Sequence, residues 1–246
     1  MSEFSYNDIF ARATLALGTA AQEELRRINV CIFGVGGVGS WCAEALVRSG
    51  VEHLTLVDFD LVSVSNINRQ REATVLSVGK SKVEELKAIL LQINPCASIE
   101  ALAKEFNATS APEFRLDRFD YIIDAIDSLK DKAELIRCAT ASRATFFSSM
   151  GAARKVDPRR IKVGNFWKVR DCPLGAALRK KLRQSGRLPE HSFQCVYGDE
   201  LIGEQKGSLV HITAIFGMTL AGLVVDSVYR KSTGEPTSEP QACDQP

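Results

Sequence analysis

The sequence lacks the features that mark secreted, disulfide-rich and zinc-binding proteins. None of its seven cysteines belongs to a Cys-x-x-Cys pair, and their number is odd. This pattern argues against a disulfide framework and against a structural zinc site, and it favours a reducing compartment. The opening residues, MSEFSYNDIF, lack a basic segment followed by an apolar one, so we expect no secretory signal and a cytoplasmic protein.

A large net charge and a long hydrophobic run are also missing. The chain has 31 Lys and Arg residues against 30 Asp and Glu residues, so no global charge indicates a polyanionic partner. The longest nearly apolar stretch runs from Ile212 to Val225 and is too short to span a bilayer. We therefore expect a buried helix over 210–229, without firm membrane contact. The three histidines form neither a triad pattern nor a metal-ligand pattern.

What is present is an ordinary globular composition. The chain has 246 residues, of which 45% are hydrophobic and 25% are charged, and this excludes wholesale disorder. Helical spacing of apolar residues over 7–27 predicts an N-terminal helical arm that occupies residues 1–27. We expect a single domain over residues 1–230. The segment 231–246 is polar, Pro-containing and aperiodic, which predicts a disordered tail.

Short β-rich runs alternate with helical patterns along most of the chain. Strands are predicted near 30–33, 53–58, 97–102, 121–125, 145–149, 161–167 and 193–197. Helices are predicted near 40–47, 80–93, 129–141, 173–184 and 210–229. The alternation up to residue 149 requires crossover connections between parallel strands. We expect an α/β fold with a Rossmann-like, mostly parallel, doubly wound sheet, helices on both faces and an added C-terminal strand and helix region.

A glycine-rich loop lies between the first predicted strand and the helix after it. Gly34, Gly36, Gly37 and Gly39 stand in the segment GVGGVG, which fits the G-x-G-x-x-G pattern. Glycines let the backbone approach a phosphate closely, and the helix N-terminus offers free N–H groups. Asp58 ends the second strand, where a carboxylate accepts hydrogen bonds from a ribose diol. These elements alone predict a dinucleotide site, and they favour an NAD-dependent dehydrogenase.

The residues after the second strand favour a triphosphate over a redox dinucleotide. Arg69 and Lys82 supply the positive charge that cleavage of a nucleoside triphosphate requires and that a pyrophosphate diester does not. Asp127 follows the fourth strand, at the edge of the sheet where ligands bind in open α/β folds. It suits Mg²⁺, which one or two carboxylates hold together with substrate phosphates. Taken alone, Asp127 is better explained as the N-cap of the helix that starts near Ser128, and one residue can serve both purposes.

These motifs resemble, in order and spacing, a known adenylating domain. The segments are GVGGVGSWCAEALVRSGVEHLTLVDFDLVSVSNINRQ, then GKSKVE, then DAIDS, and the family is the ubiquitin-activating superfamily of ThiF and MoeB type. The resemblance covers residues 6–230 and implies ATP and Mg²⁺ as cofactors. It assigns the nucleotide loop to the four glycines, the ribose to Asp58 with Asp60 close by, and the metal to Asp127. It places the phosphates among Asn66, Arg69, Gln70 and Lys82.

The resemblance extends to the N-terminal arm. The tripeptide Phe10-Ala11-Arg12 is similar to the family segment whose arginine reaches the phosphates of the neighbouring subunit. It therefore implies a homodimer in which Arg12 acts in trans on the catalytic centre. Without the resemblance, Arg12 is only a solvated helix residue.

Within the superfamily, three segments resemble the branch of tRNA threonylcarbamoyladenosine dehydratases (TcdA-like). They are SSMGA at 148–152, DP at 157–158, and CPL at 172–174 with the later CVY at 195–197. That branch uses ATP to adenylate the threonyl carboxylate of N6-threonylcarbamoyladenosine in tRNA, and an internal attack then gives the cyclic form. The missing Cys-x-x-Cys pairs weaken the alternative of a sulfur-carrier-protein adenylyltransferase of ThiF/MoeB type. A nucleotide-sensing scaffold without turnover also stays open.

Positive charge is concentrated in one region of the chain. Residues 151–190 contain twelve basic and three acidic residues, so this segment carries +9 and the rest of the chain −8. A basic region in a near-neutral protein is typical of nucleic-acid binding, and we expect tRNA to bind there. A solvated helix face is the simpler alternative.

Cys172 is the best candidate for a reactive thiol, although we favour the interpretation that it only starts a helix and has no chemical role. The sequence specifies no sulfur-transfer partner.

Overall fold

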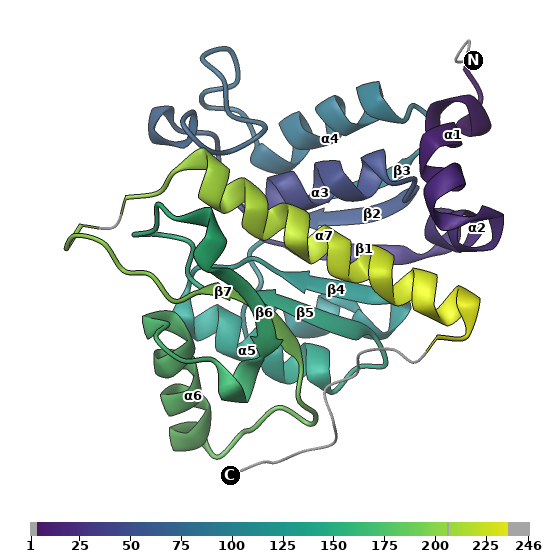
Figure 1. The fold of residues 1–246 in the computed structure, drawn as a ribbon. Helices are drawn as coiled ribbons and strands as arrows, with labels where there is room; N and C mark the ends of the chain where they lie inside the picture. Colours follow the sequence, from purple (N-terminus) through teal and green to yellow (C-terminus); the bar gives the residue numbers. More distant parts are fainter. Residues whose placement is uncertain (1–3, 206, 236–246) are drawn as a thin grey trace.

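A seven-stranded sheet forms the centre of the computed structural model, which describes residues 4–205 and 207–235 (Figure 1). The strands are β1 (Asn29–Phe33), β2 (His53–Val57), β3 (Ser98–Leu102), β4 (Tyr121–Asp124), β5 (Thr145–Ser149), β6 (Ile161–Asn165) and β7 (Gln194–Gly198). Their order is β3-β2-β1-β4-β5-β7-β6, and only β6 runs antiparallel to its neighbour. The expected Rossmann-like, mostly parallel sheet is confirmed.

Helices cover both faces of this sheet. They are α1 (Tyr6–Leu17), α2 (Thr19–Arg27), α3 (Gly39–Arg48), α4 (Lys82–Ile93), α5 (Leu129–Thr140), α6 (Pro173–Ser185) and α7 (Val210–Thr233). Short 3-10 turns are η1 (Val64–Asn66), η2 (Ala111–Phe114), η3 (Leu116–Arg118), η4 (Pro158–Arg160) and η5 (Phe166–Lys168). The helices α3, α4 and α7 pack on one face, and α5 and α6 pack on the other.

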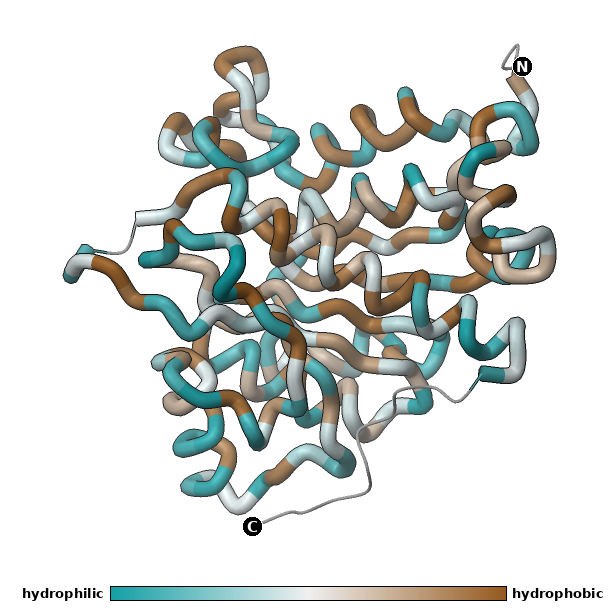
Figure 2. Tube along the Cα trace, viewed as in Figure 1, coloured by the Kyte–Doolittle hydropathy of each residue, from teal (hydrophilic) through white to brown (hydrophobic). Residues whose placement is uncertain are grey.

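The alternation of side chains along β1 explains the two cores. Val30 and Ile32 point into the cluster that contains α3, α4 and α7, whereas Cys31 and Phe33 point into the cluster with α5 and α6. All four side chains are fully buried, as expected for a central parallel strand that is covered on both sides. Figure 2 shows the apolar residues gathered in the strands and along α7, while α6 is mostly hydrophilic.

The register of the strands aligns their carboxyl ends. Phe33 pairs with Val57 on one side and with Asp124 on the other. Two further backbone hydrogen bonds extend this alignment past the strands, from Gly34 N to Val57 O and from Ala125 N to Phe33 O, both at 2.8 Å. The loops that follow β1, β2 and β4 therefore meet at one edge of the sheet.

The predicted N-terminal arm consists of two helices separated by Gly18, whose φ is +81°. The arm docks at the amino edge of the sheet, because the Tyr6 hydroxyl donates to Gly50 O (2.9 Å) and the Gln22 amide donates to Tyr6 (2.8 Å). Gly50 has a φ of +103°, and a Cβ there would overlap both the Gln22 amide and the Tyr6 hydroxyl. This edge lies opposite the one where the loops after β1, β2 and β4 meet (Figure 1).

The apolar helix is longer than the sequence predicted. α7 ends at Thr233, so the expectation of a disordered tail from Lys231 is wrong for residues 231–233, while 236–246 lie outside the described residues. By length and composition α7 could cross a membrane. However, its residues Ile212, Phe216 and Leu220 are fully buried against the sheet and α3, which confirms the expected buried helix.

Candidate functional site

Two glycines of the loop after β1 are required by close backbone packing. Gly34 has a φ of +85°, and a Cβ there would lie 2.8 Å from Ala125 O in the loop after β4. At Gly39, a Cβ would overlap the carbonyl oxygen of Gly34. The loop therefore lies directly against the β4 loop, with β2 and β4 on opposite sides of β1. In open α/β sheets such a topological switch point is the place where ligands bind.

The other two glycines face the segment that connects β2 to α4. A Cβ at Gly36 would lie 3.5 Å from the Gln70 amide nitrogen, and one at Gly37 would lie 3.3 Å from Arg69 Cγ. The Trp41 indole donates to Arg69 O at 3.0 Å and so ties this segment to α3. The structure thus brings Arg69 and Gln70 together with the glycine loop, as the sequence predicted.

Asp58 links the glycine loop to the end of β2. One carboxylate oxygen accepts the Val35 N–H and the other accepts the Asp60 N–H, both at 2.9 Å. Burial raises the pKa of Asp58, and the positive charge of Lys82 and these two N–H donors oppose that rise. Asp58 therefore has a structural task in holding the loop, and its predicted ribose contact stays a prediction.

The predicted phosphate-binding side chains are held by local contacts. Lys82 begins α4, is buried, and places its Nζ 2.8 Å from the exposed carboxylate of Asp60. The Arg69 guanidinium donates to Ser65 O at 2.8 Å and therefore folds back on its own loop. Asn66 is also buried, and its side-chain oxygen accepts the Ser63 N–H, so it stabilises the turn. The Gln70 Oε1 atom is buried without a hydrogen-bond partner.

Asp127 lies exposed at the carboxyl edge, after β4. The N-cap of α5 is Ser128, whose side chain accepts the Asp131 N–H, so the N-cap explanation for Asp127 is wrong. Among residues 4–205 and 207–235, no donor or cation contacts its carboxylate. The same part of the chain contains no cluster of three acidic, His or Cys side chains for a metal. An exposed carboxylate is the type of ligand that Mg²⁺ takes together with phosphate oxygens and water, and the metal role of Asp127 stays a prediction.

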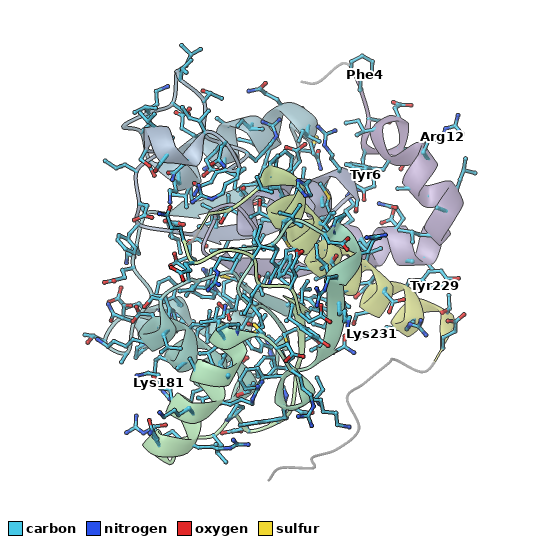
Figure 3. The ribbon with its side chains drawn as sticks, turned by 60° about the vertical axis from the view of Figure 1, so that its left-hand side comes forward. Phe4, Tyr6, Arg12, Lys181, Tyr229 and Lys231 are labelled. Atoms are coloured by element: carbon cyan, nitrogen blue, oxygen red, sulfur yellow. The ribbon has the colours of Figure 1, made fainter. Side chains whose placement is uncertain are left out.

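Among the predicted site residues, Arg12 lies away from the glycine loop and from the residues that surround it. It is exposed on α1, and α1 docks through Tyr6 at the amino edge of the sheet. Figure 3 shows Arg12 on the outside of this arm. It therefore does not reach the glycine loop of its own chain, and its action in trans stays a prediction.

A buried carboxyl group beside the site escaped the sequence-based prediction. Glu72 is 1% exposed, and neither of its carboxyl oxygens has a hydrogen-bond partner. Burial raises the pKa of Glu72 to about 7, against the opposing charge of Lys82 and with the support of Asp58. The Arg71 N–H donates to Ser40 Oγ (3.2 Å), which holds this segment against the first turn of α3. A glutamate in an irregular polar segment gives no sequence signal of burial.

The basic region is only partly free to bind an anion. Arg160 and Lys162 form ion pairs with Asp199, at 2.8 and 2.5 Å, and Arg159 pairs with Asp157 at 2.9 Å. The Lys155 Nζ donates to Glu200 O (2.6 Å) and is buried. Arg154 donates to the carbonyls of Ile202 and Gly203, and Arg179 donates to Phe166 O. The remaining positive charge is concentrated on and just before α6.

The thiol candidate in this region is closed to solvent. Cys172 is the N-cap residue of α6 and is 3% exposed. Its sulfur lies 3.7 Å from the position that a Cβ on Gly175 would take. These contacts are those of a packed helix-start residue.

The comparison with known proteins agrees with this geometry. Residues 10–244 match the ThiF family. The chain is 38% identical over 191 residues to the tRNA threonylcarbamoyladenosine dehydratase of Bacillus subtilis (strain 168), which covers 78% of this chain and 74% of that protein. The fold matches the crystal structure of E. coli tRNA N6-threonylcarbamoyladenosine dehydratase with ATP (TM-score 0.87, 29% identity, 94% and 97% of the two chains). The corresponding AMP complex matches with a TM-score of 0.86 and 29% identity over 93% and 96% of the two chains.

Replacement of Glu72 by Gln should change how stability depends on pH. The raised pKa of Glu72 means that the folded protein keeps its proton between the ordinary carboxyl pKa and about 7, whereas the unfolded chain loses it. The free energy of unfolding therefore falls as the pH rises through this range, by about 3 kcal/mol in total. Urea unfolding should give E72Q the wild-type stability near pH 4.5 and a higher stability near pH 8.

The exposed Glu113 provides the matched control, because E113Q makes the same chemical change without burial. E113Q should follow the wild type at both pH values. If E72Q also follows the wild type, Glu72 is not a buried group with a raised pKa.

Proposed function

The chain belongs to the ThiF family, and from that membership we propose that it is an ATP-dependent tRNA threonylcarbamoyladenosine dehydratase. It acts on N6-threonylcarbamoyladenosine in tRNA and converts it to the cyclic form. The observation that carries this function is the placement of Arg69 and Gln70 against the glycine loop, in a fold that the ATP-bound dehydratase shares. A polyphosphate bound at this loop meets both side chains.

The reaction has two steps, and neither requires a nucleophilic side chain. In the first, the threonyl carboxylate attacks the α-phosphorus of ATP, the bond between the α- and β-phosphates breaks, and pyrophosphate leaves. In the second, an atom of the substrate's own threonylcarbamoyl group loses its proton and attacks the activated carboxyl carbon. AMP then leaves with a former carboxylate oxygen, and the ring closes. Because this attack is intramolecular, correct positioning supplies most of the catalysis.

The side chains of this chain neutralise the phosphate charge. Lys82 is held beside Asp60 at the start of α4, and Arg69 lies next to Gly37, which supports a role for both cations in neutralising the departing pyrophosphate. Asp127 would hold Mg²⁺ at the carboxyl edge, where the ion supplies further positive charge to the phosphate oxygens. Asp58, with Asp60 beside it, would accept hydrogen bonds from the ribose.

A homodimer explains the position of Arg12. The connection between β2 and α4 exposes large apolar side chains next to the site, and Val75 and Leu76 are 79% and 83% exposed. Others on the same segment are Phe59, Leu61 and Val64. Exposed apolar surface of this kind favours contact with another protein chain. We infer that a second copy covers this segment and that its Arg12 completes the site.

The surface of α6 is the proposed contact for tRNA. Among the described residues, no acidic side chain forms a salt bridge with Lys168, Arg170, Lys180 or Lys181. Figure 3 shows Lys181 on α6, far from Arg12 and from the N-terminal arm. A group of cations without acidic partners attracts the phosphate backbone. Because tRNA is the substrate, we place the enzyme in the cytoplasm.

Purified protein, ATP, Mg²⁺ and tRNA that contains threonylcarbamoyladenosine should yield the cyclic nucleoside, AMP and pyrophosphate, as measured by mass spectrometry of digested tRNA. The variant D127A should lose about 100-fold or more in turnover, because a charge-stabilising group is removed. The same substitution at Asp117, near the other end of β4, should leave turnover unchanged. Turnover of a diglycine-ended carrier protein or of NAD in place of tRNA would contradict the function, and full activity of D127A would contradict the metal role.

Mixing two inactive variants tests the action of Arg12. The R12A homodimer lacks the arginine at both of its sites and the D127A homodimer lacks the carboxylate at both, so each should be inactive. In a random mixture that exchanges subunits, half of the dimers are mixed and each has one intact site, so about a quarter of the wild-type turnover should return. If proven mixed dimers show no recovery, Arg12 does not act in trans.

Reversal of charge on α6 should weaken tRNA binding. The triple variant K180E/K181E/R183E removes cations that contact phosphate, so its affinity for tRNA should fall and the slope of log K against log salt should become shallower by about 2. The control R27E/K87E/K104E makes the same change in net charge on α2, α4 and the segment after β3, and it should bind as the wild type. Equal binding of both triple variants at low and moderate salt would exclude α6 as the tRNA surface.

A further inference from the structure

A buried ion pair lies directly below the loop that carries Asp127. Lys132 on α5 and Asp124 at the end of β4 are both 0% exposed, and Lys132 Nζ lies 2.8 Å from Asp124 Oδ2. The same Nζ donates a second hydrogen bond to Ile126 O at 2.9 Å. Lys132 thus joins the strand end to the residue immediately before Asp127.

The remaining polar atoms of this cluster are also satisfied. Ser148 Oγ on β5 donates to Asp124 Oδ2 at 2.6 Å, and the Ile126 N–H donates to Asp124 Oδ1 at 3.1 Å. Burial raises the pKa of Asp124, and the Lys132 ammonium is the largest effect that opposes this rise. A buried ion pair adds little to net stability compared with apolar residues of the same size, so the main effect of this pair is on the geometry of the loop that it holds.

The loop that this ion pair holds also supports the glycine loop. A Cβ at Gly34 would lie 2.8 Å from Ala125 O and 3.1 Å from Ile126 N, so the β4 loop is the surface on which the glycine loop rests. The Asp124 carboxylate and the Lys132 ammonium hold the N–H and the C=O of Ile126, which directly precedes Asp127.

We propose that Lys132 is a positioning residue for the adenylation reaction, which acts through Asp124 and Ile126 to hold the Asp127 carboxylate at the phosphate end of the nucleotide site. This inference rests on the proposed function. Lys132 touches neither the nucleotide nor the metal, so its loss affects the phosphate end of the nucleotide selectively. The adenosine end, which AMP shares with ATP, keeps its own contacts at Asp58 and the glycine loop.

Two variants separate positioning from stability. K132M leaves the buried Asp124 carboxylate without its cation, which disfavours folding. The double variant K132M/D124N removes both charges, while the asparagine still accepts the Ile126 N–H. We expect the double variant to fold with a melting temperature close to that of the wild type, and to lose only the hold on Ile126 O.

The measurement is calorimetric titration with AMP and with ATP plus Mg²⁺. K132M/D124N should bind AMP within about twofold of the wild type and should bind ATP plus Mg²⁺ about tenfold or more weakly, as is typical when a residue behind a metal ligand is lost. The matched control is K155M, because Lys155 is also a buried lysine bonded to a loop carbonyl, that of Glu200. K155M should bind both nucleotides as the wild type does.

The other possible results would overturn the positioning role of Lys132, the proposed function, or both. Equal weakening of AMP and ATP in the double variant, wild-type affinity for both, or failure of the double variant to fold would overturn the positioning role of Lys132. If the wild type binds ATP with Mg²⁺ but does not cyclise threonylcarbamoyladenosine, the proposed function fails while the selective loss in the double variant still stands as a measured result. A wild type that binds neither nucleotide would overturn both.

Discussion

The site depends on one contact between two pieces of backbone. The glycine loop after β1 and the loop after β4 approach so closely that a single methyl group at residue 34 would collide with the carbonyl of Ala125. Because no side chain separates these loops, the loop that leads into α3 and the loop that carries Asp127 lie side by side at one edge of the sheet. Arg69 lies beside this loop on the β2–α4 connection and Lys82 begins α4, and positive charge next to a glycine loop suits a polyphosphate ligand.

Those parts of the fold that repeat regularly could be predicted from the sequence. The strands at 30–33, 121–125 and 145–149 were recognisable because they are short apolar runs between polar turns, and the structure places strands at these positions. The glycine loop was recognisable because the types and spacing of its residues follow a chemical requirement, whereas the metal role of Asp127 came from the resemblance to the family and stays a prediction. The predicted boundary differs at the end of α7, where Lys231 donates to the Tyr121 hydroxyl (3.2 Å) and the helix continues to Thr233, beyond its apolar stretch.

Other features of the site depend on burial, which composition does not reveal. Lys132 and Glu72 stand in polar surroundings in the sequence and would be expected on the surface, yet both are buried in the fold. The basic region shows the converse error, since several of its cations are paired with Asp199 or bonded to carbonyls of 200–203, which lie outside the segment whose charge was counted. For the basic region these partners lie about 40 residues further along the chain and are brought near by the fold, whereas Lys132 is buried by partners only six and eight residues away.

The arrangement of α7 affects how the chain acquires its structure during synthesis. This helix follows all the other described elements in sequence, but its buried residues pack against α3 and against the face of the sheet that β1 begins. A growing chain on the ribosome therefore leaves the part of this face that α7 covers exposed until α7 has emerged, although α3 and α4 precede it, and during that interval this apolar surface is open to chaperones and to aggregation.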